Sequence, residues 1–140
     1  NNKKEYIKSI EHCLHQLIEA KVPYDEMIIL SSFKKENSSL SDIDKLLDLT
    51  IFDITQNNQN NNKRSIEFCT MQSFKGLEKK AVIAIDLFDL EELEQKYLHY
   101  CGLSRARVVL YICLQEEQRV AYDKLSKEFG ERLAKKIITN

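Results

Sequence analysis

The chain has 140 residues, of which 43% are hydrophobic and 31% charged, and this is the composition of one ordinary globular domain. Its formal net charge of −1 excludes a global basic field that would hold a whole domain to phosphates, so any nucleic-acid site must come from local patterning. The longest apolar runs are far shorter than the about 20 residues that span a bilayer, and no signal-peptide pattern is visible, so we expect a cytoplasmic protein without a membrane partner.

The first part of the chain predicts one helix followed by strands. Apolar residues recur at steps of three and four over residues 3–20, which predicts a helix with one face on a sheet. Pro23 ends this pattern, and the unbroken apolar run 27–30 predicts a strand buried on both faces, as in parallel sheets covered by helices. After a polar loop whose serines suit helix caps, we expect a short helix around residues 43–47 and a strand at 50–54.

The second part continues this alternation. Residues 56–62 are asparagine and glutamine only, and we expect a flexible surface loop there. Three further apolar runs predict strands, at residues 66–69, 81–85 and 108–114. Helices are expected at residues 89–102 and 116–130, before a short basic tail. This order predicts a single α/β domain over residues 1–140, a three-layer α/β/α sandwich with a mostly parallel sheet.

The cysteines indicate neither a disulfide framework nor a zinc site. The four cysteines, Cys13, Cys69, Cys101 and Cys113, form no C-x-x-C pair, and three of them lie in apolar runs or on an apolar helix face. We expect small buried side chains in a reducing compartment, and no metal ligands in this chain.

Two polar loops carry residue types that bind nucleotides and nucleic acids. The first, residues 70–78, starts with hydroxyl and amide side chains, continues with a glycine and ends with the carboxylate of Glu78. Hydroxyls and free amides bind phosphate oxygens, whereas a carboxylate accepts hydrogen bonds from ribose hydroxyls. In the second, residues 102–107, Arg105 and Arg107 flank an alanine, and guanidinium groups bind phosphates. The first loop thus has the chemistry for two different ligands.

Two segments in these loops keep an ordered set of residue types: Thr70-x-Gln72-x-x-Lys75-Gly76-Leu77-Glu78 and Tyr97-Leu98-x-Tyr100-x-Gly102-Leu103-Ser104-Arg105-Ala106-Arg107. They resemble motifs V and VI of the superfamily 1 helicases, in the second RecA-like domain of UvrD-like enzymes and their nuclease-related-domain relatives. The resemblance covers about residues 7–114 in family order. It implies a RecA-like, P-loop NTPase-like domain.

The resemblance also implies a role for each matching residue. Arg105 matches the arginine that contacts the γ-phosphate of ATP, and Glu78 matches the carboxylate that binds the ribose, with Gly76 on the nucleotide side. The residues implied to contact nucleic acid are Thr70, Gln72, Ser73 and Lys75. The chain departs from the family at two positions, because Gln72 stands where many members have histidine and Ser32 where UvrD itself tends to have arginine.

By this resemblance we expect the C-terminal motor domain of an ATP-dependent DNA helicase, which uses ATP with Mg²⁺ and binds single-stranded DNA, or alternatively RNA. No G-x-x-x-x-G-K-[ST] occurs in the chain, so we expect that loop and the metal ligands in an N-terminal RecA-like domain of the same parent chain, and no activity of this fragment alone. One alternative is a degenerate RecA-like module that binds nucleic acid or protein without ATPase activity. Another is a different α/β enzyme, for which no paired nucleophile and base is visible.

Overall fold

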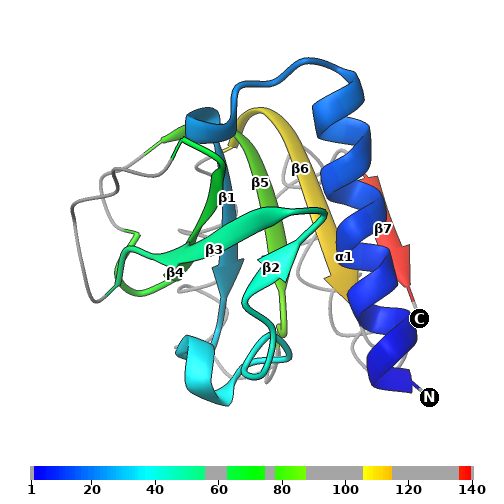
Figure 1. Ribbon diagram of the computed structural model, residues 1–140, viewed down its shortest axis with the longest axis vertical. Coiled ribbons are helices and arrows are strands. Elements are labelled where there is room, and N and C mark those ends of the chain that lie inside the picture. The colour runs from blue at the N-terminus through cyan, green and yellow to red at the C-terminus, as the bar shows by residue number, and fades with distance from the viewer. Residues whose placement is uncertain (1, 56–62, 75–77, 88–105, 115–135, 140) are drawn as a thin grey trace, which may run out of the picture.

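The structure, a computed structural model, describes residues 2–55, 63–74, 78–87, 106–114 and 136–139. Its described elements are one α-helix, two short 3₁₀ helices and seven strands (Figure 1). In chain order they are α1 (Asn2–Glu19), η1 (Tyr24–Glu26), β1 (Met27–Ser31), η2 (Lys35–Asn37), β2 (Lys45–Leu46), β3 (Leu49–Asp53), β4 (Ser65–Thr70), β5 (Lys79–Ile85), β6 (Ala106–Leu114) and β7 (Lys136–Thr139).

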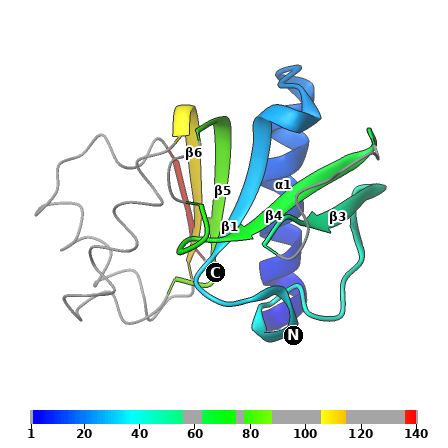
Figure 2. The same cartoon turned by 90° about the vertical axis from the view of Figure 1, so that its left-hand side faces the viewer.

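Helix α1 covers one face of the sheet (Figure 2). Its buried residues recur at helical spacing and belong to the main hydrophobic core: Tyr6, Ile10, Cys13, Leu14 and Leu17. The helix ends before Lys21, which takes a left-handed φ of 62°, and the Val22 amide then donates to the Leu17 carbonyl at 3.1 Å. The helix predicted at residues 3–20 is therefore confirmed.

The seven strands form one sheet in the order β2-β3-β4-β1-β5-β6-β7. Every neighbouring pair is parallel except β2 and β3, which are antiparallel. β1 lies between β4 and β5, and Ile29 pairs with Phe68 on one side and Ile83 on the other. The predicted α/β class with a mostly parallel sheet is confirmed, as are the strands predicted at 27–30, 50–54, 66–69, 81–85 and 108–114, within one or two residues at each end.

The central strands are buried on both faces. Ile29, Phe68 and Ile83 belong to the core cluster that includes α1. The residues next to two of them along the strands, Ile28 and Val82, point to the opposite face and are also 0% exposed. Burial of both faces explains why these strands read as unbroken apolar runs rather than as an alternating pattern.

The helix predicted around Ile43, Leu46 and Leu47 is wrong. The structure has the β2–β3 hairpin there, with Leu46 paired to Leu49 and both side chains in the core. The two turn residues, Leu47 and Asp48, have positive φ values of 48° and 67°, as a type I′ turn requires. Apolar residues three and four apart suggested a helix, but Leu46 ends β2 and Leu47 lies in the tight turn that reverses the chain.

The basic tail also differs from the prediction, because it contains the strand β7. This strand pairs in parallel with β6, with Tyr111 opposite Lys136 and Cys113 opposite Ile138. The loop predicted at residues 56–62 and the helices predicted at 89–102 and 116–130 lie outside the described residues. Within the described ranges, no helix is both long and apolar enough to cross a membrane.

Candidate functional site

The two edges of the parallel sheet carry different parts of the candidate site. We call the edge where β1, β4 and β5 end the carboxyl edge, and the edge where they begin the amino edge. Thr70 and Ile85 both pair with Ser31, so all three residues lie level at the carboxyl edge. Lys79 pairs with Ala106, so β5 and β6 begin side by side at the amino edge.

At the carboxyl edge, residues 70–74 form a tight turn that Thr70 orders. The Thr70 side chain is buried, and its hydroxyl accepts a hydrogen bond from the Ser73 amide at 3.2 Å. Met71 and Phe74 are 2% and 1% exposed and fix the turn to the core, whereas the side chains of Gln72 and Ser73 are exposed. Of the predicted nucleic-acid contacts, the side chains of Gln72 and Ser73 are therefore exposed to solvent, whereas the buried Thr70 side chain orders the turn that carries them.

The loop after β1 is joined directly to this turn. The Met71 amide donates to the Ser31 carbonyl at 2.9 Å, and the Ser31 hydroxyl accepts from the Phe33 amide at 3.0 Å. Ser31 is completely buried, so the start of the loop is fixed relative to residues 70–74. Lys34 and Lys35, exposed and half-buried, follow within the same loop.

Asp86 holds the C-terminal end of the loop after β1 through hydrogen bonds from Ser39. The sequence alone did not single out this residue. Its carboxylate accepts from the Ser39 amide at 2.8 Å and from the Ser39 hydroxyl at 2.5 Å. Its own amide donates to the Tyr6 hydroxyl at 2.8 Å, which in turn donates to the Cys113 carbonyl at 2.7 Å. One residue thus links the end of β5 to α1, to β6 and to the loop after β1.

Burial changes the ionisation of the groups around this link. The pKa of the Tyr6 hydroxyl is raised well above its ordinary value, first because the ring is buried and second because Asp86 is near. The thiols of Cys13 and Cys113 are 3.9 Å apart, and this contact together with burial raises the pKa of Cys113. Tyr6 is therefore a neutral donor and acceptor at physiological pH.

At the amino edge, Glu78 is exposed immediately before β5. The next residue, Lys79, is anchored, because its Nζ contacts the Glu67 Oε1 at 2.9 Å and donates to the Asp25 carbonyl at 2.6 Å. Both side chains of this ion pair are only 17% exposed, so water screens it little. The backbone that carries Glu78 is therefore held in place at its C-terminal side.

Three predicted site residues, Lys75, Gly76 and Arg105, lie outside the described residues. Arg105 is nevertheless the residue before Ala106, which pairs with Lys79, the residue after Glu78. Two of the three residues predicted to bind the nucleotide, Glu78 and Arg105, thus come in the chain directly before strands that start side by side.

The two groups of predicted site residues are well separated. Thr70 is level with Ile85, and Lys79 lies six residue steps before Ile85 along β5. At 3.3 Å per residue, the start of β5 lies roughly 20 Å from the level of Thr70. Glu78 and the 70–74 turn therefore cannot contact the same small ligand, but one continuous loop joins them.

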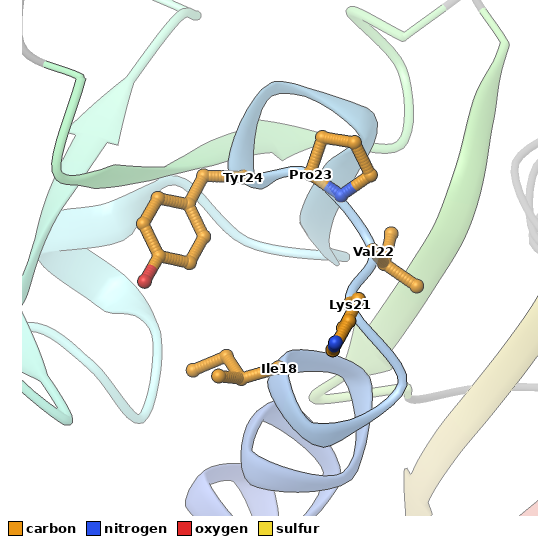
Figure 3. Close-up of a pocket in the computed structure, with 5 residues that line it drawn as sticks. All are labelled: Ile18, Lys21, Val22, Pro23 and Tyr24. Carbon is orange, nitrogen blue, oxygen red and sulfur yellow. The ribbon is translucent and has the colours of Figure 1, made fainter.

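A shallow pocket also opens at the amino edge, between the end of α1 and η1 (Figure 3). Its volume is about 280 Å³, and its lining residues are Ile18, Lys21, Val22, Pro23 and Tyr24. None of them is a residue that the sequence predicted for the site. Among the described residues, no group of three or more His, Cys, Asp or Glu side chains is arranged to hold a metal ion.

The fold and the site define an α/β domain with polar loops at both edges of a mostly parallel sheet. No protein-family model, curated protein or solved structure matches the chain. Residue pattern and geometry are therefore the basis for a functional assignment.

Proposed function

We propose that this chain is the second RecA-like domain of an ATP-dependent helicase of superfamily 1, with a three-layer α/β/α architecture. The observation that carries the proposal is the pairing of Lys79 with Ala106. It places the residues that follow Glu78 and Arg105 in the chain, two of the three residues assigned to the nucleotide, side by side at the start of neighbouring strands. Gln72 and Ser73, assigned to the nucleic acid, are exposed at the carboxyl edge.

On the nucleotide side, an exposed carboxylate at Glu78 suits the hydroxyls of a ribose, because an ionised carboxylate only accepts hydrogen bonds. Arg105 would place its guanidinium at the γ-phosphate and stabilise the charge that develops during phosphoryl transfer. Gly76 allows the loop backbone to approach the nucleotide. Mg²⁺ bound with ATP would neutralise phosphate charge, and its ligands belong in this proposal to a further RecA-like domain that carries G-x-x-x-x-G-K-[ST].

On the nucleic-acid side, Gln72 and Ser73 offer neutral hydrogen-bonding groups and Lys75 a positive charge to a single strand. Thr70 keeps the turn in shape through its contact with the Ser73 amide. Residues 70–78 join the two sites along the chain, so a movement at the nucleotide is transmitted to the bound single-stranded nucleic acid. This arrangement suits a motor in which closure around ATP shifts the grip on single-stranded DNA.

The proposal is tested by ATPase activity of the full-length protein with saturating single-stranded DNA. Arg105→Ala is expected to lower kcat at least tenfold, equivalent to about 1.4 kcal/mol of barrier. Arg64→Ala is the matched control, because Arg64 precedes β4 and has no assigned role, and its turnover should stay at the wild-type level. Equal turnover of Arg105→Ala and wild type would refute the assigned role of Arg105.

The same assay distinguishes the ATP-dependent motor domain from the alternative, a degenerate RecA-like module. Such a module would bind single-stranded DNA or a protein but hydrolyse no ATP with any nucleic acid present. Binding of DNA without turnover in the wild-type protein would favour this alternative, while DNA-stimulated turnover would favour the motor.

A further inference from the structure

Asp86 has an unusual backbone conformation for a residue with a side chain. Its φ of 56° lies in the left-handed region, which residues other than glycine adopt uncommonly, asparagine and aspartate most often among them. Such a conformation persists only where the surroundings stabilise it. Here the stabilising contacts are the two hydrogen bonds from Ser39 to the carboxylate and the one from the Asp86 amide to the Tyr6 hydroxyl.

These contacts fix the loop after β1 at both of its ends. Ser31 holds the first end through the Phe33 and Met71 amides, and Ser39 holds the second end through Asp86. Between them, the Ser38 hydroxyl donates to the Lys35 carbonyl at 2.8 Å and accepts from the Leu40 amide at 3.1 Å. Residues 32–38, which we call the β1 loop, are therefore held in one conformation beside the 70–74 turn.

The β1 loop adds positive charge to the carboxyl edge. Lys34 is exposed and Lys35 half-buried, against one acidic residue of the loop, Glu36. The adjoining turn contributes only neutral groups, Gln72 and Ser73, among its exposed side chains. A site for single-stranded nucleic acid needs cationic side chains in addition to neutral donors, because the affinity of a protein for nucleic acid depends chiefly on how many phosphates it neutralises.

We propose that Asp86 is a positioning residue: it holds the β1 loop against the 70–74 turn, so that Lys34 and Lys35 contact phosphates of the same single strand that Gln72 contacts. The inference rests on the proposed function for the identity of the ligand. The positioning itself rests on the Asp86–Ser39 contacts. The two parts can therefore be tested separately.

The positioning is tested by hydrogen exchange of the full-length protein. Asp86→Gly removes the carboxylate but tolerates a φ of 56°, so it isolates the hydrogen bonds from backbone strain. We expect amides of residues 33–40 to exchange about tenfold faster, since two charge-assisted hydrogen bonds are lost, while amides of β1 are unchanged. Asp86→Asn keeps one acceptor oxygen and tolerates the left-handed region, so it should recover part of the protection. Unchanged exchange at residues 33–40 in Asp86→Gly would overturn the positioning.

The role in binding is tested by the single-stranded DNA dependence of the ATPase. Asp86→Gly should raise the half-saturating concentration of oligo(dT) about fivefold, leaving kcat at saturating DNA and the KM for ATP at wild-type values, because a loop that must be ordered on binding lowers affinity alone. Faster exchange with an unchanged half-saturating concentration would overturn the role in binding. A wild-type protein that DNA neither stimulates nor binds would instead refute the proposed function, and the exchange data would still decide the positioning.

Ser39→Ala serves as a second variant if Asp86→Gly does not fold. Ser39 is half-buried and lies outside the core, and the substitution removes only the 2.5 Å contact from the hydroxyl while the amide contact stays. It should show the same two effects at smaller size. Lys45→Ala, at an exposed position of β2, is the control and should show neither.

Discussion

Lys79 of β5 pairs with Ala106 of β6, whereas Thr70 of β4 pairs with Ser31 at the other edge of the sheet. The chain between Thr70 and Lys79 therefore connects the end of β4 at one edge of the sheet to the start of β5 at the other. Its first residues are exposed at the carboxyl edge, and Glu78 is exposed at the amino edge. In the proposed function, this one loop contacts the nucleotide at the amino edge and the single-stranded nucleic acid at the carboxyl edge.

The Tyr6 hydroxyl is a structural hydrogen-bonding group whose removal should be costly. It donates to the Cys113 carbonyl and accepts from the Asp86 amide inside the core. Tyr6→Phe leaves both backbone groups without this partner, so we expect a loss of about 1–3 kcal/mol in the free energy of unfolding. Urea denaturation measures the loss.

The control for this change is Tyr24→Phe. Tyr24 is half-buried in η1, and its hydroxyl makes no hydrogen bond within the described part of the chain. Its loss should stay within about 0.5 kcal/mol. Equal effects of the two substitutions would show that the hydrogen bonds of Tyr6 contribute nothing to stability.

The raised pKa of Tyr6 predicts a specific loss of stability at alkaline pH. The folded protein keeps the hydroxyl protonated at a pH where the unfolded chain ionises it, so above about pH 10 the folded state binds more protons than the unfolded state. The contribution of the Tyr6 hydroxyl to the free energy of unfolding is therefore complete below about pH 10. It decreases above that pH, by up to about 1.4 kcal/mol per pH unit. Thermal unfolding of wild type and Tyr6→Phe at pH 9 and pH 11 should show a steeper decline for wild type. Parallel declines would contradict the account.

The β2–β3 turn should tolerate, and benefit from, residues that favour positive φ. Leu47 is 39% exposed and Asp48 is exposed, and both are in the left-handed region. The double substitution Leu47→Asn and Asp48→Gly supplies the preferred pair of a type I′ turn and relieves left-handed backbone strain of about 1–2 kcal/mol per residue, part of which is offset by the greater freedom of glycine in the unfolded chain. Thermal unfolding should show a higher Tm, and a lower Tm would argue against the hairpin.

Asp86→Gly is the informative contrast to Asp48→Gly. Both residues have positive φ, but only the Asp86 carboxylate accepts hydrogen bonds from Ser39. At Asp86 the loss of these hydrogen bonds therefore outweighs the relief of backbone strain, whereas at Asp48 the relief of strain decides the change in stability.

The sequence predicts the elements whose pattern is local and repeated. The spacing of Ile10, Leu14 and Leu17 predicts α1, and the unbroken runs predict the central strands, because each pattern reflects burial against a whole layer of the fold. The hairpin was missed because Leu47 and Asp48 are not the residues that usually mark a type I′ turn. The strand β7 was missed because a four-residue strand in a basic segment has too few positions for a pattern.

The candidate site was predictable only in part, for a similar reason. Glu78, Gln72 and Ser73 lie in a loop with a recognisable order of residue types. Asp86 acts through partners that are 47 and 80 residues away in the chain, Ser39 and Tyr6. No local pattern encodes such a contact: the register of β5 against β1 brings Asp86 to the loop that contains Ser39, and the packing of α1 on the sheet brings Tyr6 to it.

The most direct test of the central claim is one steady-state ATPase experiment on the full-length protein, in which ATP and single-stranded DNA are titrated separately for two variants. Glu78→Ala should raise the KM for ATP about tenfold and leave the half-saturating DNA concentration unchanged, because it removes hydrogen bonds to a charged acceptor. Gln72→Ala should raise the half-saturating DNA concentration about threefold and leave the KM for ATP unchanged, because it removes one neutral hydrogen bond. The assignment of the nucleotide to the amino edge and of single-stranded DNA to the carboxyl edge is contradicted if either variant raises the KM for ATP and the half-saturating DNA concentration equally. It is also contradicted if Glu78→Ala affects only the DNA concentration and Gln72→Ala only the KM for ATP.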